Sequence, residues 1–254
     1  MTLFYVLLSS VVEGLTEFLP VSSTGHLIIL NHLFNINVTP LLSSFDIFIQ
    51  LGAILAIVNL YYKELLEDKK QILNLLASFI PTAIVGLIFY PFIKSYLLDN
   101  IVVTTISLFV GGLIIFVLPS QKTNKKGLSY IDYFKIGLFQ SLSIIPGTSR
   151  ALMTIIGGLY SGLNLSESIK YSFLLAIPTI GAATVLDLFK NKDIIFSDPE
   201  SIKLFIIGFL ISFITAKLTV NTFLNFSKKN GLRFFGFYRI ALSAVLLILF
   251  ILPL

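Results

Sequence analysis

The stretch EGLTEFLPVSSTGH, residues 13–26, decides the fold of this chain, because it places two acids, the hydroxyl run Ser22-Ser23-Thr24 and a histidine between strongly apolar flanks. An ionisable side chain at membrane depth costs about 3 kcal/mol or more and normally faces a protein interior or a water-filled cavity. The stretch therefore predicts a polar site inside a membrane-embedded bundle, and it marks its own side chains as functional candidates.

The rest of the composition agrees with this reading. Of the 254 residues, 56% are hydrophobic and only 12% are charged, whereas a soluble domain is about 25% charged. We expect an all-α polytopic membrane protein, a single integral domain over residues 1–254. The net charge of +5 is spread over short lysine clusters, which indicates loops anchored at the bilayer rather than nucleic-acid binding. The absence of cysteine excludes disulfides, thiolate metal sites and cysteine nucleophiles.

Six apolar runs approach or exceed the roughly 20 residues that a spanning helix needs: Phe45–Tyr62, Ile72–Ile93, Ile101–Pro119, Ser168–Phe189, Ile202–Phe223 and Phe234–Leu254. Four shorter pieces form two pairs, each broken at a proline: Leu3–Leu19 with Ser22–Phe34, and Tyr130–Ile145 with Ala151–Leu163. Because these pieces are short for a crossing, each pair predicts a re-entrant helical hairpin. The first residues, Met1 to Val12, lack the features of a cleaved signal peptide and are expected to belong to the mature fold.

The two hairpins indicate an internal repeat. Sliding the chain against itself by 126 residues aligns Pro20 with Pro146, Ser22 with Thr148, Ser23 with Ser149, and Phe45-Asp46 with Tyr171-Ser172. We expect repeat 1 over about residues 1–125 and repeat 2 over about 126–254, each with one hairpin and three spans. Three spans are an odd number of crossings, so the second repeat would be inverted relative to the first.

The positions of lysine and arginine in the loops favour this inverted arrangement. It places ten of them on one side of the membrane and four on the other, whereas hairpins that cross once give nine against five. The ten are Lys63, Lys69, Lys70, Lys122, Lys125, Lys126, Lys170, Lys228, Lys229 and Arg233, and the four are Lys94, Lys190, Lys192 and Lys203.

Glu13 and Glu17 are four residues apart, so on a helix they share one face and converge on one ligand. Two carboxylates this close repel each other, so either one of them holds a proton or a divalent cation, Mg²⁺ or Ca²⁺, lies between them. The alternative is a pair of acids that reaches toward water from a helix end.

The hydroxyl groups of Ser22, Ser23 and Thr24 precede an apolar helix, where each is also an ordinary N-cap residue. Together with Gly25, which allows close approach, and His26, they match a nucleophile and a base beside an anion site at a helix N-terminus. His26 alone could be a hydrogen-bonded polar residue in a tight bundle, and we expect that role for His32.

The second hairpin turns at Pro146-Gly147-Thr148-Ser149-Arg150, again at the start of a helix. The planar, five-donor guanidinium of Arg150 suits a phosphate or a carboxylate, and a cation beside helix N-terminal amides points to an anionic substrate. A structural ion pair with Glu13 or Glu17 is the alternative. Taken together, the two tips suit phosphoryl transfer from a lipid phosphate.

The stretch EGLTEFLPVSSTGH together with PGTSR resembles the two signature motifs of the undecaprenyl-diphosphate phosphatase family, the bacitracin-resistance proteins of bacterial membranes. The resemblance extends through residues 45–52 and through SFLLAIP at 172–178. It implies hydrolysis of a polyprenyl diphosphate, undecaprenyl diphosphate, to the monophosphate and phosphate. It implies a multi-pass protein of the plasma membrane with its site open to the outer face, where this reaction recycles the carrier for cell-wall polymers and confers bacitracin resistance. It also implies six spans, two re-entrant hairpins in inverted repeats, and frequent homodimers.

The resemblance assigns roles by position. It implies that Glu17 is the more directly catalytic acid, with Glu13 beside it and both linked to a divalent cation, that Ser23 is the nucleophile, and that His26 is essential. It implies that Arg150 clamps the diphosphate, with supporting ligands at Ser22, Thr24, Gly25, Gly147, Thr148 and Ser149. Where the family continues Arg-Ser-Gly-Ala-Thr, this chain has Arg150-Ala151-Leu152-Met153-Thr154, which removes one candidate phosphate ligand and one close-packing point.

A secondary transporter or flippase for an anionic phosphate substrate is the main alternative, because inverted repeats with broken helices at the membrane midplane are a transporter architecture. Such a protein needs the acids and the arginine but has no need for a Ser-Ser-Thr-Gly-His cluster.

Overall fold

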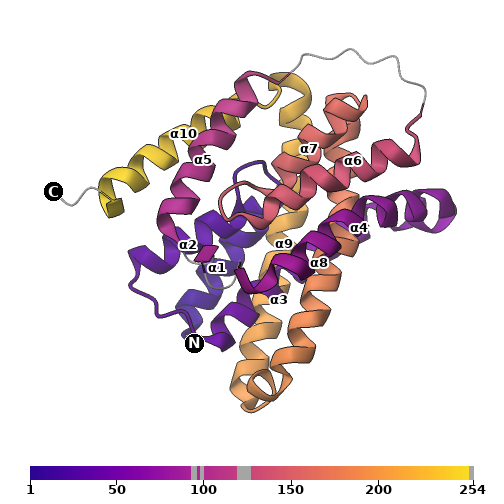
Figure 1. Ribbon diagram of the computed structural model, residues 1–254. Coiled ribbons are helices and arrows are strands. Elements are labelled where there is room, and N and C mark those ends of the chain that lie inside the picture. Colours follow the sequence, from indigo (N-terminus) through magenta and orange to yellow (C-terminus); the bar gives the residue numbers. More distant parts are fainter. Residues whose placement is uncertain (93–95, 98–99, 119–126, 252–254) are drawn as a thin grey trace.

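The computed structural model describes residues 1–92, 96–97, 100–118 and 127–251, and in these ranges the regular elements are helices (Figure 1). They are α1 (Leu3–Thr16), α2 (Ser23–Leu33), α3 (Pro40–Glu67), α4 (Lys69–Phe92), α5 (Ile101–Phe116), α6 (Tyr130–Ser141), η2 (Leu142–Ile144), α7 (Arg150–Ser161), α8 (Leu165–Ile195), α9 (Pro199–Asn230), α10 (Arg233–Leu246) and η3 (Leu247–Ile251). Outside the described residues lie the predicted run ends Ile93, Pro119 and Leu254, the loop lysines Lys94, Lys122, Lys125 and Lys126, and the predicted boundary between repeats.

Among the described residues, five helices are long and apolar enough to cross a membrane: Pro40–Glu67, Lys69–Phe89, Leu165–Ile195, Pro199–Asn230 and Arg233–Phe250. This is the architecture of a multi-pass membrane protein. The predicted run from Ile101 forms a helix of only 16 residues, about 24 Å long, so it falls short of the roughly 30 Å of hydrocarbon that a straight span must cross. The sixth span therefore stays a prediction.

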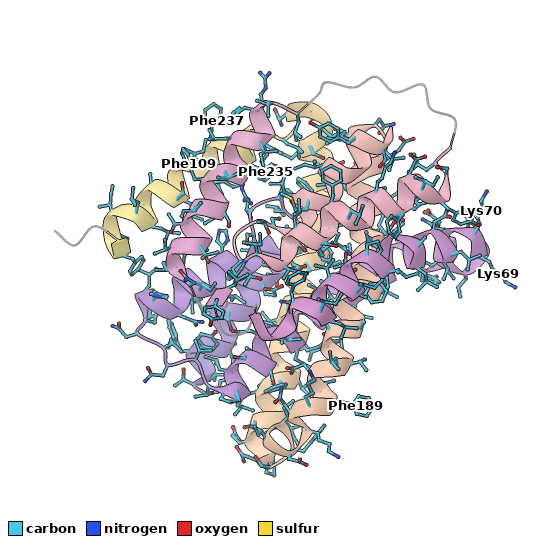
Figure 2. The ribbon with its side chains drawn as sticks, in the orientation of Figure 1. Lys69, Lys70, Phe109, Phe189, Phe235 and Phe237 are labelled. Carbon is cyan, nitrogen blue, oxygen red and sulfur yellow. The ribbon has the colours of Figure 1, made fainter. Side chains whose placement is uncertain are left out.

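Large apolar side chains point out of the bundle as well as into it. Phe109, Phe189 and Phe237 project outward in Figure 2 and are 44%, 74% and 65% exposed, while Phe235 lies between helices and is 5% exposed. Lys69 and Lys70 lie at the outer end of α4 (Figure 2). An apolar exterior of this kind is suited to contact with lipid.

Two pairs of short helices stand where the sequence predicts hairpins. Helix α1 ends at Thr16 and α2 begins at Ser23, with Pro20 in the turn between them. Helix α6 continues into η2, and α7 begins at Arg150 after the turn that contains Pro146. We call residues 17–22 the first tip and residues 145–149 the second tip.

Each short helix that begins a hairpin packs against a long helix of the other half of the chain. Helix α1 lies on α9, and α6 lies on α4, while α3 packs against α8 and α9 and α5 packs along α10 (Figure 1). Gly14 and Gly137 allow the first two contacts, because a Cβ atom at either position would overlap a backbone carbonyl, that of Ser212 or that of Ser78. Glycine at these two positions therefore allows α1 and α6 to approach the backbones of α9 and α4 closely.

The residue that caps the second helix of each hairpin has a positive backbone φ angle. Ser22 has φ 71° and Ser149 has φ 75°, both in the region that favours glycine, and the hydroxyl of each accepts a backbone N–H of the helix that follows. Such a conformation costs about 1–3 kcal/mol and is retained where surrounding structure enforces it. The caps match at an offset of 127, one more than the predicted 126, so the backbone counterpart of Ser22 is Ser149 rather than Thr148.

Candidate active site

The two tips meet at one cavity of about 180 Å³. From the first tip and the start of α2 it is lined by Glu17, Ser22, Ser23 and Thr24, and from the second tip and the start of α7 by Pro146, Gly147, Ser149 and Arg150. Gln50 of α3, Ile180 of α8 and residues 143–145 complete the lining. The contact between tips that the sequence predicts is therefore present.

Glu17 lies at the junction and binds both sides of it. Its Oε1 accepts from the guanidinium of Arg150, at 3.1 Å from Nη2 and 3.3 Å from Nε. Its Oε2 accepts the hydroxyl of Ser23 at 2.5 Å. The side chains of Glu17 and Arg150 are only 7% and 10% exposed, so this is a largely desolvated pair in which the loss of either partner leaves a buried charge.

Arg150 is the first residue of α7, and neighbouring helices aim its side chain. Its Nη1 donates to the carbonyl oxygen of Ser172 in α8 at 2.9 Å, and its guanidinium lies 5.8 Å from the ring centroid of Phe18. The hydroxyls of Thr154 and Ser172, 2.5 Å apart, tie α7 to α8 beside this contact. The structural pairing considered as an alternative is thus present in this state, on the cavity wall.

Glu13 lies one helical turn before Glu17, whose backbone N–H donates to the Glu13 carbonyl at 2.9 Å. Its side chain is completely buried, and neither carboxyl oxygen has a hydrogen-bond partner in the described part of the chain. Glu17 and Asp46 are its acidic neighbours. The pair therefore does not reach toward water from a helix end; Glu13 is buried outside the cavity lining, where an unpartnered carboxyl group is costly.

The hydroxyl groups of the two tips differ in their partners. Those of Ser22 and Ser149 accept the N–H groups of Gly25 and Leu152, both at 3.2 Å, and so cap α2 and α7. Ser23 alone among them bonds to Glu17. Thr24 lines the cavity, whereas Thr148 lies off its wall and donates its hydroxyl to the carbonyl of Ile145 at 2.6 Å.

The two tip glycines are placed differently. Gly147 lines the cavity with φ 89°, and a Cβ atom there would overlap the Thr104 carbonyl, so the position requires glycine. Gly25 lies outside the cavity lining and packs beside Thr104.

His26 lies outside the cavity lining. Its Nδ1 is 2.7 Å from the carbonyl oxygen of Ser22, and because a carbonyl can only accept, Nδ1 carries a proton. Its Nε2 is 2.7 Å from the hydroxyl of Tyr238, on which the ring stacks. The imidazole therefore holds the backbone of the first tip and is not bonded to Ser23.

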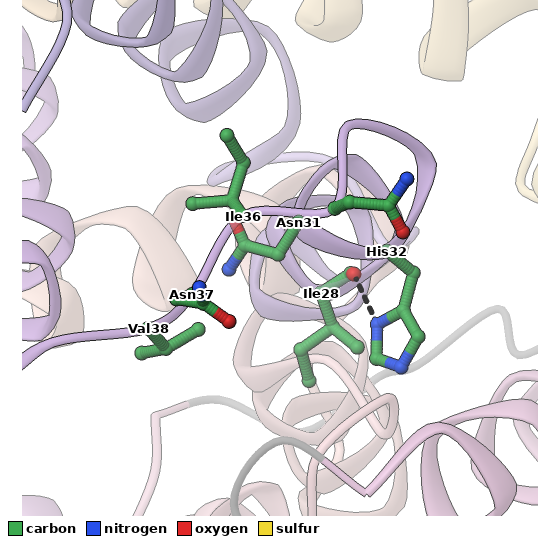
Figure 3. Close-up of a pocket in the computed structure, with 7 residues that line it drawn as sticks. Ile28, Asn31, His32, Ile36, Asn37 and Val38 are labelled. Carbon is green, nitrogen blue, oxygen red and sulfur yellow. Dashed lines mark hydrogen bonds between the residues drawn. The ribbon is translucent and has the colours of Figure 1, made fainter.

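His32 is hydrogen-bonded as expected, with Nδ1 3.0 Å from the carbonyl oxygen of Ile28 (Figure 3). It lines a second cavity, about 260 Å³, at the end of α2. The other lining residues are Ile28, Asn31, Asn35, Ile36, Asn37 and Val38. Its lining contains neither acid nor arginine, whereas the cavity between the tips is lined by Glu17 and Arg150.

The departure from the family pattern leaves the second tip in place. Ala151 and Leu152 are completely buried, and Leu152 belongs to the main apolar core rather than to the cavity wall. Arg150 still reaches Glu17 from the residue before them.

Sequence reasoning missed the residues that support the tips. Arg239 of α10 bonds to both tips, Tyr238 bonds to His26, Gln50 lines the cavity, and the Ser172 carbonyl holds Arg150. An arginine within the apolar run from Phe234 was a visible signal, because charges at membrane depth are functional candidates. The carbonyl of Ser172 had none, because backbone contacts do not depend on residue type.

Residues 6–245 match the family model of the bacitracin resistance protein BacA. The chain is 43% identical over 251 residues to a protein of Aquifex aeolicus named undecaprenyl-diphosphatase, covering 96% of this chain and 97% of that one. A protein of the same name from Thermus thermophilus is 44% identical, and the match covers 94% of each chain. One from Campylobacter hominis is 41% identical, and the match covers 96% of this chain and 97% of that one. The chain belongs to the BacA bacitracin resistance protein family.

Proposed function

We propose that this protein hydrolyses undecaprenyl diphosphate to undecaprenyl phosphate and inorganic phosphate. The observation that carries the proposal is the position of Glu17, whose carboxylate bonds the hydroxyl of Ser23 on one side and the guanidinium of Arg150 on the other. A candidate nucleophile, a candidate base and a cation suited to phosphate thus line one cavity. The names of relatives about 40% identical over nearly the whole chain support the same substrate.

In the proposed reaction, Ser23 is the nucleophile. Its oxygen forms a bond to the terminal phosphorus while Glu17 accepts the hydroxyl proton, and the bond from that phosphorus to the bridging oxygen breaks. The lipid monophosphate leaves with the bridging oxygen, and water then splits the phosphoserine to release phosphate and restore the hydroxyl. Serine is favoured over His26 because only the serine is bonded to Glu17 and lines the cavity.

Arg150 and two helix N-termini supply the positive potential for this step. Helices α2 and α7 begin at the cavity, at Ser23 and Arg150, and the first amides of a helix attract phosphate. The guanidinium would exchange part of its contact with Glu17 for phosphate oxygens, whose negative charge is largest in the transition state.

A divalent cation fits the acids as part of the proposal. Mg²⁺ is commonly held by one or two carboxylates together with substrate phosphates, and Glu13 offers two buried oxygens that lack a partner in the described structure. Within the described residues no group of three acids or histidines gathers as a metal site, so substrate oxygens would complete the ligand set. Bound there, the cation would neutralise phosphate charge, and Glu13 and Glu17 would hold it.

The membrane arrangement is also proposed. The helix pairs α1 with α9 and α6 with α4 exchange partners between the two halves, which supports two inverted repeats with six spans and two re-entrant hairpins. We place the site open to the outer face of the plasma membrane, where hydrolysis would recycle the carrier for cell-wall polymers and confer bacitracin resistance.

Purified protein is expected to release inorganic phosphate from a polyprenyl diphosphate, measured over a titration of Mg²⁺ and of Ca²⁺. Glu200→Gln, at an exposed ion pair with Lys203, serves as the matched unaffected variant. Wild-type protein that releases no phosphate at any cation concentration, yet moves the lipid phosphate across vesicle membranes, would make it a transporter instead.

Replacing Ser23 with alanine is expected to lower kcat by about 1,000-fold or more, because it removes the proposed attacking oxygen. Ser22→Ala is the neighbouring comparison: Ser22 also lines the cavity, but its hydroxyl caps α2 instead of bonding to Glu17, so the change is expected to cost about 1 kcal/mol of stability with a much smaller loss of turnover. Initial rates of phosphate release measure both variants. If Ser23→Ala keeps most turnover while His26→Ala does not, the serine nucleophile is ruled out.

A further inference from the structure

A buried arginine from the last long helix binds both tips at once. Arg239 of α10 is completely buried. Its Nη1 donates to the carbonyl of Pro20 in the first tip at 3.1 Å, and its Nη2 donates to the carbonyl of Gly147 in the second tip at 2.8 Å. Nη2 also reaches the carbonyls of Ser107 in α5, at 3.0 Å, and of Thr148, at 3.3 Å. One guanidinium thus joins two turns that are 127 residues apart in sequence.

The packing of α10 against α5 leaves space for the side chain of Arg239. Helix α10 packs along α5 (Figure 1), and the guanidinium passes α5 at Gly111, where a Cβ atom would overlap it. Glycine at this position is therefore required by the arginine rather than by its own backbone, which has no positive φ. The two residues act together: Arg239 binds the tips, and Gly111 leaves space for its guanidinium.

The contacts of Arg239 differ in kind from those of Arg150. Those found in the described structure are to carbonyl oxygens, whereas Arg150 pairs with a carboxylate. Arg239 therefore adds a positive charge that Glu17 does not offset, close behind the cavity. A net positive charge there favours an anionic ligand.

The hydrogen bonds of Arg239 also orient the peptide groups of the tips. In a trans peptide the C=O and N–H point in opposite directions. Because the Thr148 carbonyl is held toward Arg239, the N–H of Ser149 points to the opposite side, and Ser149 lines the cavity. Carbonyl oxygens directed at a diphosphate would repel it, and Arg239 keeps three of them, one from the first tip and two from the second, turned away.

We propose that Arg239 is a positioning residue for phosphate release: it fixes the separation of the two tips and turns their carbonyls away from the substrate. This rests on the proposed function, since it concerns how Glu17, Ser23 and Arg150 are held for that reaction. A displacement of about 1 Å between reacting groups lowers rates by about 100-fold, so the effect is expected mainly in kcat.

The test compares Arg239→Ala, Arg239→Lys and Gly111→Ala with Arg233→Ala, an exposed arginine on the same helix, and with Gly86→Ala, a helical glycine with open space around it. We expect Arg239→Ala and Gly111→Ala to lower kcat by about 100-fold with KM changed by less than about 5-fold. Both controls should retain wild-type kcat. Added guanidinium ion, at a concentration that leaves the wild type folded, should raise the kcat of Arg239→Ala at least about tenfold and leave the kcat of Arg233→Ala unchanged.

A structural role alone would give a different pattern. Arg239→Ala that keeps more than half of wild-type kcat, or Gly111→Ala that matches Gly86→Ala, overturns the assignment. So does a loss of kcat that parallels a fall in Tm and shows no guanidinium rescue. If Arg239→Ala does not fold, Gly111→Ala and Arg239→Lys decide, the latter with an expected loss of about tenfold because lysine cannot span both tips.

The failure of this assignment is distinct from failure of the proposed function. Binding of a methylene-bridged polyprenyl diphosphonate, which cannot be hydrolysed, is measured alongside turnover. Wild-type protein that binds this probe without ever releasing phosphate contradicts the hydrolase. Arg239→Ala that binds the probe within about fivefold of wild type but releases phosphate about 100-fold more slowly supports the positioning role, whereas a tenfold or greater loss of probe affinity with unchanged kcat contradicts it.

Discussion

Replacement of Arg150 by alanine is expected to lower kcat/KM for phosphate release by about 1,000-fold or more, the range found when an arginine that stabilises phosphoryl transfer is removed. Two physical effects add. The substrate loses its bidentate cation, and Glu17 is left 7% exposed without the guanidinium that offsets its charge. Initial rates of phosphate release over a range of substrate concentrations measure the loss.

Arg150→Lys separates these two effects. Lysine keeps the positive charge but not the fork that bonds Glu17 and the Ser172 carbonyl together. We expect it to recover part of the activity, with about a 100-fold loss remaining. Arg233→Ala, an exposed arginine at the start of α10, is the matched control and should behave as wild type. If Arg150→Ala keeps a tenth or more of wild-type kcat/KM, Arg150 does not act as the diphosphate clamp.

Glu17→Gln is expected to lower kcat by about 100- to 10,000-fold, the usual contribution of a general base. Glutamine has nearly the same shape, so the loss is one of charge and basicity rather than packing: Oε2 no longer takes the proton of Ser23, and Arg150 loses its ion pair. Single-turnover phosphate release and Tm, measured together, distinguish a chemical loss from unfolding.

Glu200→Gln removes an exposed carboxylate from a surface pair and should change neither quantity, since such pairs contribute about 0–1 kcal/mol. Glu17→Gln with normal turnover would show that another group activates the nucleophile. Because Glu13 lies one turn away without a hydrogen-bond partner among the described residues, Glu13→Gln is the next variant to measure in that case.

Much of the fold is visible in the sequence because hydrophobic length and proline placement act locally. The four short helices begin and end within a few residues of the predicted pieces, and five of the six predicted runs form helices long enough to span. The helix from Ile101 is shorter than its apolar run suggests, since apolarity indicates a lipid-like environment but does not fix helix length.

The site was predictable where residue type carries the chemistry. Glu17, Ser23 and Arg150 stand out as polar groups between apolar runs, and the structure brings these three together. The place of His26 was not predictable, because whether an imidazole faces a cavity or a neighbouring tyrosine depends on tertiary packing. The one-residue shift between the caps is likewise invisible in an alignment, because Ser22 and Ser149 share a backbone conformation rather than a sequence position.

The central claim is that the two tips form one site through Glu17 and Arg150, and a double-mutant cycle tests it most directly. Glu17→Asp and Arg150→Lys keep charge and leave measurable activity, so kcat/KM of phosphate release is compared for wild type, both single variants and the double variant. If the two side chains act as a unit, the double variant should fall within about threefold of the worse single variant. Losses that multiply would contradict the claim, because they would show that each residue contributes independently of the other.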